Sequence, residues 1–104
     1  MDTIEFFEKP GCSTNTKQVA ALRAAGCAVD TRSLLSHPWT ADTLLAFLGP
    51  LPSTAWFNPA APRVKTGQIR PDALMPEEAL AALLDDHLLI RRPLIRIGDT
   101  RMVG

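Results

Sequence analysis

The chain has 104 residues, of which 46% are hydrophobic, and its 11 basic residues balance its 11 acidic ones. This length predicts one domain over residues 1–104, and the balanced charge argues against a nucleic-acid-binding protein. No apolar run approaches the roughly 20 residues that a membrane helix needs, and the first residues lack the pattern of a secretory signal. Two cysteines are too few for a disulfide-stapled secreted scaffold, so we expect a cytoplasmic protein.

The first third of the chain predicts a β-α-β unit. Residues 4–7 form a short apolar run rich in strand formers, and the Lys-Pro-Gly sequence at 9–11 is typical of a turn. Apolar residues then recur at helical spacing from Thr16 until Gly26, which takes the usual position after a helix. Residues 27–34 partly alternate and suit a second strand. This order predicts parallel strands joined by a right-handed crossover.

The rest of the chain predicts helices and then a hairpin. Thr40 caps a helix that runs to Leu48, Pro-rich residues 56–71 form loop or short helical turns, and Pro76 opens a third helix. Residues 94–97 and 101–103 form strands around a turn. We therefore predict an α/β fold of the thioredoxin-like class, a four-stranded mixed sheet with a helical insertion before its C-terminal hairpin. A final helix normally covers such a sheet, which leaves two alternatives: a chain that continues beyond Gly104, or another cover for the hairpin.

Cys12 is the strongest candidate for chemistry. It follows a strand, a turn and Gly11, and it precedes a helix, where backbone N–H groups and the helix dipole favour a nucleophilic thiolate. Lys9 adds positive potential, whereas Glu8 opposes ionisation if it points toward the sulfur. The alternative is a buried cysteine that packs as a small hydrophobe.

Four further residues of the predicted helix start are candidates for capping or for binding an anion. They are polar or basic and lie within five residues after Cys12: Ser13, Thr14, Asn15 and Lys17. Because no Cys-x-x-Cys pair is present and neither histidine has ligand-like spacing to a cysteine, we expect no metal site and no bound cofactor.

Arg91, Arg92 and Pro93 form the second informative stretch. A peptide bond before proline can be cis and can hold a substrate beside a redox cysteine. Adjacent residues of an extended segment point in different directions, so we expect only one of the two arginines to face the site, where it would bind an oxyanion or a carboxylate. The alternative is two solvent-exposed charges before an edge strand.

Other conspicuous residues have structural interpretations. Cys27 is expected to pack in the core, too far from Cys12 for a disulfide. Trp56 and Phe57 are expected to fill a gap beside the insertion helices. Arg63 lies in a basic loop that is solvated by default and that binds an anion in the alternative interpretation. The two histidines, His37 and His87, are expected to be isolated on the surface.

The chain resembles the ArsC/Spx branch of thioredoxin-like proteins, and within it the small proteins named nitrogenase-associated. The matching segments span nearly the whole chain in the family's order: residues 7–12, Asn15, residues 17–18, 25–26, 56–59, 61–65 and 88–94. In the arsenate reductases of this branch, the resemblance implies a cysteine that attacks arsenate and is resolved by glutathione and glutaredoxin.

The resemblance carries over onto only some of the family's positions. The cysteine is matched by Cys12, and the arginine before the proline is matched by Arg92. The family's histidine and arginine around the cysteine are replaced by Glu8 and Thr16, and an arginine of the middle segment has only Arg63 as a loose substitute. The Spx-like Cys-x-x-Cys switch, whose members bind RNA polymerase, is not matched, because Asn15 stands at the second cysteine.

Three hypotheses follow. The leading one is a nitrogenase-associated-type protein in which Cys12 is a redox thiol that reacts with glutathione or glutaredoxin, and whose protein partner is nitrogenase-related. The second is an arsenate reductase with Cys12 as nucleophile and Arg92 as oxyanion clamp. The third is a non-catalytic module that binds a protein partner.

Overall fold

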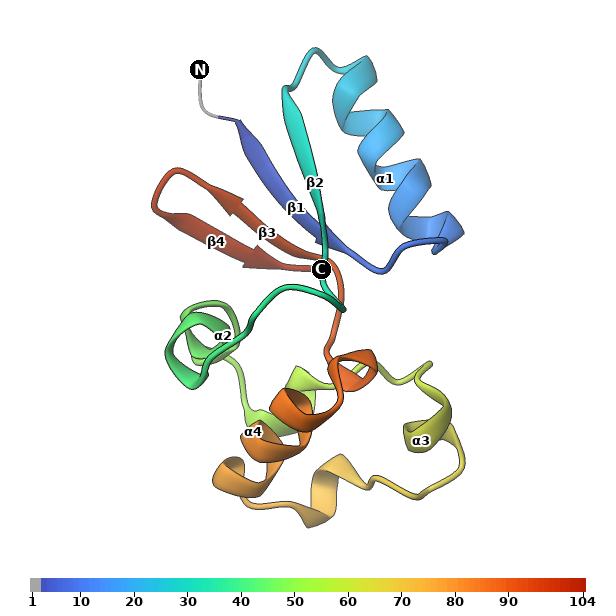
Figure 1. The fold of residues 1–104 in the computed structure, drawn as a ribbon, viewed down its shortest axis with the longest axis vertical. Helices are drawn as coiled ribbons and strands as arrows, with labels where there is room; N and C mark the ends of the chain where they lie inside the picture. Colours follow the sequence, from blue (N-terminus) through green and yellow to red (C-terminus); the bar gives the residue numbers. More distant parts are fainter. Residues whose placement is uncertain (1–2) are drawn as a thin grey trace. The chain divides into compact units, whose positions relative to one another are not determined.

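The computed structural model describes residues 3–104, and the chain divides into two compact units (Figure 1). Unit 1 contains residues 3–37 together with 92–104, and unit 2 contains residues 38–91. Unit 2 corresponds to the helical insertion that the sequence predicts. The organisation of both units as one domain stays a prediction.

Unit 1 is built on a four-stranded mixed sheet with the order β2-β1-β3-β4. Strands β1 (Ile4–Glu8) and β2 (Val29–Ser33) are parallel, whereas β3 (Leu94–Ile97) pairs antiparallel with both β1 and β4 (Thr100–Val103). The predicted α/β class and mixed sheet are therefore confirmed. Strand β1 lies inside the sheet. Its consecutive residues Phe6 and Phe7 point to opposite faces of the sheet, and both are buried.

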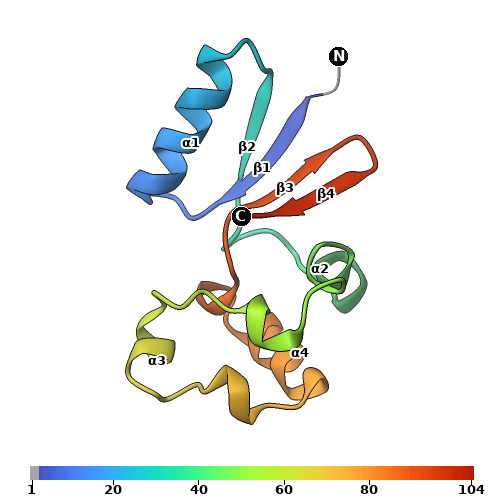
Figure 2. The same cartoon turned by 180° about the vertical axis from the view of Figure 1, so that it is seen from behind.

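Helix α1 (Ser13–Ala24) connects the two parallel strands (Figure 2). It begins three residues before the predicted start at Thr16, because the Cys12 carbonyl already accepts the Thr16 N–H at 3.0 Å. It ends as predicted: Gly26 has a positive φ of 90°, and the Gly26 and Cys27 amides return to carbonyls of the last turn, a Schellman arrangement. The buried apolar residues of unit 1 come from the strands, from this helix and from the segments beside them: Ile4, Phe6, Phe7, Val19, Leu34 and Leu94.

Unit 2 is helical. Its α-helices are α2 (Ala41–Leu48), α3 (Pro62–Lys65) and α4 (Pro76–Asp85), and its short 3-10 turns are Ser53–Trp56, Pro71–Ala73 and His87–Leu89. The start of α2 is as predicted, because Thr40 and Thr43 form a reciprocal capping box. The 3-10 turn at His87–Leu89 is not predicted by the sequence; it forms where the Asp86 carboxylate accepts the Leu88 N–H at 3.0 Å.

Two distant segments of unit 2 run side by side. Phe57 forms an antiparallel bridge with Ile90, and the Arg91 N–H donates to the Trp56 carbonyl at 2.9 Å. Trp56 and Phe57 are consequently buried, and the Trp56 indole donates to the Leu51 carbonyl at 3.0 Å. These aromatic residues are therefore part of the core of unit 2.

Residues 3–104 contain neither a candidate membrane-spanning helix nor a candidate metal-binding cluster. No helix in that range combines the length and the apolar character needed to cross a membrane. In the same range, no three or more His, Cys, Asp and Glu side chains are grouped so that they could hold a metal ion.

Candidate functional site

The candidate site begins with a tight turn at the end of β1. The Cys12 N–H donates to the Lys9 carbonyl at 3.0 Å, which closes the turn. Gly11 has a φ of 81°, a backbone conformation that side chains with a Cβ rarely adopt. The turn therefore delivers Cys12 directly to the N-cap of α1.

Asn15 fastens this turn to the helix. Its side chain is only 2% exposed; Oδ1 accepts the Lys9 N–H at 3.2 Å and Nδ2 donates to the Gln18 side chain at 3.1 Å. The sequence predicts Asn15 as a capping or anion-binding residue, but its side chain is already used inside the protein. Gln18 was missed as a supporting residue, although its spacing of three from Asn15 places both on one helix face.

Arg92 reaches Cys12 through the pairing of the strands. Strand β3 runs antiparallel to β1, and Phe7 lies opposite Leu94. The residues just before β3 therefore lie at the same end of the strand pair as the residues just after β1. Arg92 precedes Leu94 by two residues, and its peptide bond to Pro93 is cis. The side chain of Arg92 interacts with the sulfur of Cys12 both as a hydrogen-bond donor and as a positive charge.

These groups lower the pKa of Cys12. The largest cause is the backbone N–H of Asn15, which donates to the sulfur; Arg92 and the N–H of Thr14 act in the same direction. Partial burial of the sulfur raises the pKa and opposes them, but the net direction is downward. The backbone N–H groups and Arg92 therefore favour the ionised sulfur.

The sulfur is also accessible. Cys12 is half-buried, free of any disulfide, and flanked by the exposed residues Ser13 and Thr14. Lys17 is exposed on the following turn of α1. A partly exposed, readily ionised sulfur beside a guanidinium can attack an electrophile that carries negative charge.

Two other predicted anion-binding residues lie in unit 2 and have partners there. The Arg91 side chain donates to the Ala55 carbonyl at 3.2 Å. The Arg63 side chain forms an ion pair with Asp86 at 2.8 Å, a partner 23 residues away that no local sequence pattern indicates. Of the adjacent arginines, Arg92 is thus the one in the same unit as Cys12.

Three structural expectations change. Cys27 is free and half-buried, whereas we predicted it in the core. His37 is half-buried and meets the Phe7 ring edge-on with 4.9 Å between ring centroids, so it is not isolated on the surface. His87 is likewise half-buried.

Sequence comparison identifies a relative of this chain. The chain is 51% identical over all its 104 residues to a protein of Rhodospirillum rubrum described as an uncharacterized 15.7 kDa protein in the draG 3′ region, of which it covers 73%. No family model matches the chain.

Solved structures reproduce the fold at lower identity. A protein from Bacteroides fragilis described as related to the ArsC family superposes with a TM-score of 0.83 at 24% identity, over 98% of this chain and 89% of that one. An arsenate reductase from Vibrio cholerae superposes with a TM-score of 0.81 at 20% identity, over 99% and 90%. At these identities the likeness establishes the ArsC-like thioredoxin fold.

Proposed function

This chain belongs to the ArsC-like thioredoxin-fold family, together with the 15.7 kDa protein of Rhodospirillum rubrum, and on that premise we propose that Cys12 is a glutathione-linked redox thiol. The observation that supports the proposal most strongly is the convergence of the Asn15 amide and the Arg92 guanidinium on one accessible sulfur. Both groups favour the thiolate, which is the reactive form of cysteine.

The proposed reaction is a thiol–disulfide exchange. The Cys12 thiolate attacks one sulfur of glutathione disulfide, a new S–S bond joins Cys12 to one glutathione, and the other glutathione leaves as a thiolate with the electron pair of the broken bond. A second thiol, from glutathione or a glutaredoxin, reverses the step by attacking the mixed disulfide. Arg92 would pair with a carboxylate of glutathione.

The chain needs an external thiol to complete this cycle. Cys27 follows α1, whose 12 residues rise about 18 Å, whereas the Cα atoms of a disulfide lie within about 7 Å. Cys12 and Cys27 therefore cannot resolve each other. We propose the cytoplasm as the compartment, because free thiols persist there.

Mass spectrometry of the protein after incubation with glutathione disulfide tests this proposal. We expect one glutathione adduct on Cys12, unchanged in Cys27→Ser and absent in Cys12→Ser. Failure of the folded protein to form an adduct, or an adduct confined to Cys27, would refute a redox role for Cys12.

Arsenate reduction is a second candidate, and the position of Arg92 beside Cys12 favours it, because a guanidinium can hold an oxyanion next to the attacking sulfur. Two residues argue against arsenate reduction: Glu8 and Thr16 stand where the arsenate reductases that this chain resembles have a histidine and an arginine. Turnover of arsenate with glutathione and glutaredoxin, lost in Cys12→Ser, would establish it. Absence of turnover by the folded protein would reject it.

A nitrogenase-related partner is the proposal for the cellular context. It is supported by the resemblance to nitrogenase-associated proteins and by the Rhodospirillum rubrum relative, which belongs to the draG region, a locus of nitrogenase regulation. Affinity capture from nitrogen-fixing cells should recover a nitrogenase component. If it does not, and if Cys12 still reacts with glutathione disulfide, the redox role stands without this partner.

A further inference from the structure

A hollow of about 460 Å³ lies against helix α1 in unit 1, on the side of β1 and β2. Its lining combines polar and apolar residues: Glu8, Thr16, Val19, Ala20, Arg23 and Thr31. Its volume falls in the range of sites that bind small molecules.

The hollow begins one helical turn from Cys12. The backbone N–H and the hydroxyl of Thr16 both donate to the Cys12 carbonyl, at 3.0 Å and 3.1 Å. Four residues of α1 rise about 6 Å, so the end of the hollow at Thr16 lies about one helical turn from Cys12. Glu8 ends β1, four residues before Cys12, and lines the hollow together with Thr16.

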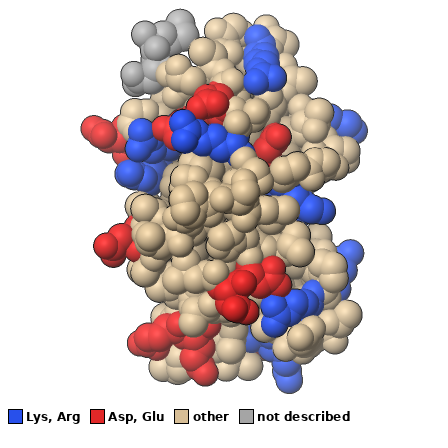
Figure 3. Space-filling view, viewed as in Figure 1, with Lys and Arg blue, Asp and Glu red and all other residues tan. Residues whose placement is uncertain are grey.

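The carboxylate of Glu8 stands out among the acidic groups of the sheet. Glu5 pairs with Arg96 at 2.9 Å and Asp30 pairs with Arg32 at 3.1 Å, and Figure 3 shows acidic and basic side chains next to each other over the sheet of unit 1. Glu8 is half-buried and forms no ion pair or hydrogen bond with any side chain of residues 3–104. It thus presents an uncompensated negative charge to the hollow.

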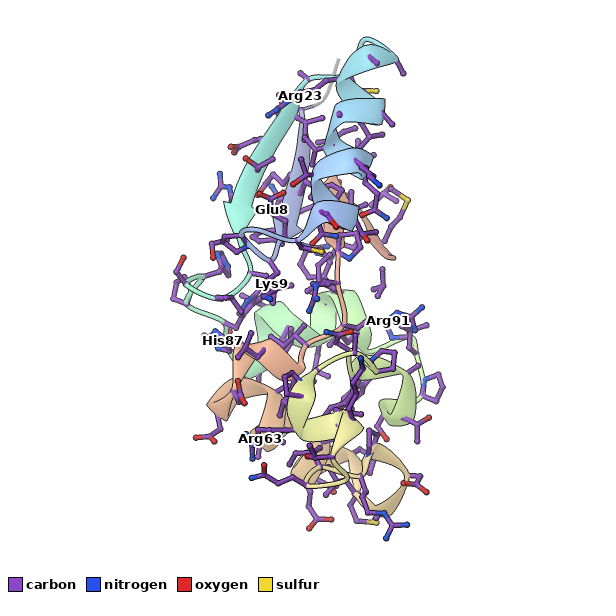
Figure 4. All side chains as sticks on the ribbon, turned by 90° about the vertical axis from the view of Figure 1, so that its right-hand side faces the viewer. Glu8, Lys9, Arg23, Arg63, His87 and Arg91 are labelled. Atoms are coloured by element: carbon purple, nitrogen blue, oxygen red, sulfur yellow. The ribbon has the colours of Figure 1, made fainter. Side chains whose placement is uncertain are left out.

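Arg23 does not neutralise that charge. Its guanidinium donates to the Val29 carbonyl at the start of β2, whereas Glu8 pairs with Ser33 at the end of that strand. Four residues of strand separate these positions by about 13 Å. Figure 4 shows Glu8 and Arg23 accordingly near opposite ends of β2.

We propose that the hollow binds the ammonium group of a small zwitterionic thiol compound whose sulfur reacts at Cys12, with Glu8 as the counter-ion. Thr16 and Thr31 offer hydroxyl oxygens to the remaining ammonium hydrogens. Arg92 flanks the sulfur with the opposite charge, which suits the carboxylate of the same compound. This inference deepens the proposed redox function and rests on it, because it specifies which thiols Cys12 selects.

Exchange rates with three small disulfides of different charge test this selection. The reagents are cationic cystamine, neutral bis(2-hydroxyethyl) disulfide and anionic 3,3′-dithiodipropionate; in each reaction Cys12 bonds to one sulfur and the other leaves as a thiolate. We expect Glu8→Gln to lower the ratio of the cystamine rate to the neutral rate by about three- to tenfold, the range of a partly screened charge pair. Division by the neutral rate removes any change in the reactivity of Cys12 itself.

Glu5→Gln is the matched control. It removes the same charge from the same strand, but positions 5 and 8 are three steps apart along β1, so the side chain of Glu5 lies on the other face of the sheet. The rate ratio should stay at the value of the unmodified protein. An unchanged ratio in Glu8→Gln, or an equal fall in both variants, would overturn the proposal.

A binding measurement separates this inference from the redox function. S-methylglutathione carries the ammonium and carboxylate groups but has no free thiol, so its binding does not depend on the reactivity of Cys12. We expect it to shift the backbone amide resonances of Thr16, Val19 and Ala20 in the unmodified protein and not in Glu8→Gln. If those resonances do not move, the hollow is not an ammonium site, whether or not Cys12 reacts with disulfides.

Discussion

The guanidinium of Arg92 lies against the sulfur of Cys12, although the two residues belong to opposite ends of the chain. The contact exists because β3 pairs antiparallel with β1, so that the entry to one strand meets the exit from the other. Reactivity at Cys12 therefore depends on formation of the sheet as well as on the local helix start.

Replacement of Arg92 by Gln should raise the pKa of Cys12, because both its hydrogen bond and its charge favour the thiolate. The pKa of Cys12 in Arg92→Lys should lie between those of Arg92→Gln and the unmodified protein, since lysine keeps the charge and loses the planar donor group. The pH dependence of alkylation by iodoacetamide measures this pKa. Arg70→Gln, which removes an exposed charge in unit 2, serves as the control and should leave it unchanged. Equal pKa values in the Arg92→Gln and unmodified proteins would contradict the assignment.

Asn15→Ala should lower the free energy of unfolding by about 1–3 kcal/mol, because it leaves the partly buried Lys9 N–H without its acceptor. Urea denaturation followed by circular dichroism measures this change. Gln18→Ala is the milder comparison, since Gln18 is exposed and supports only the amide group of Asn15. A loss below about 0.5 kcal/mol in Asn15→Ala, the usual effect of a neutral surface substitution, would show that Asn15 does not hold the turn.

The glycines at the two ends of α1 provide a matched pair. Gly11 and Gly26 have φ values of 81° and 90°, and nothing lies within 4 Å of a Cβ built at either position. Alanine should therefore cost about 1–2 kcal/mol at each through backbone strain alone. Only Gly11→Ala should also slow alkylation of Cys12, because Gly11 belongs to the turn that positions the sulfur. Equal alkylation rates in both variants would mean that the turn does not control reactivity.

The depressed pKa of Cys12 also predicts how stability depends on pH. A thiol whose pKa is lower in the folded state stabilises the fold fully above its unfolded pKa of about 8.5, and this contribution disappears as the pH falls through the folded pKa. Cys12→Ser removes the contribution. The difference in unfolding free energy between the unmodified protein and Cys12→Ser should consequently be larger at about pH 9 than at about pH 6. A difference that does not change with pH would be inconsistent with a stabilised thiolate.

Sequence patterns predict the elements whose signals are local. Three predicted helix boundaries agree with the structure: the proline that opens α4, the Thr40 cap of α2 and the glycine that ends α1. The start of α1 was placed too late, because several polar residues before Thr16 compete as caps and cysteine is not a common one.

The relationships that were missed connect residues far apart in the sequence or need three-dimensional shape. The ion pair of Arg63 with Asp86 and the bridge between Phe57 and Ile90 depend on how unit 2 packs, and no periodicity indicates them. The sequence predicts Asn15 as a capping or anion-binding residue, whereas its burial follows from the turn that folds back onto it. The sequence therefore indicates Cys12 and Arg92, whereas the groups that surround them follow only from the three-dimensional fold.

The titration of Cys12 in a Cys27→Ala background tests the central claim most directly, because this variant has a single thiol. The pH profile of its alkylation rate should give a pKa below the ordinary cysteine value of about 8.5. A pKa at or above that value, in a protein shown to be folded, would mean that the Asn15 amide and Arg92 do not stabilise the thiolate, and the account of the site would fail.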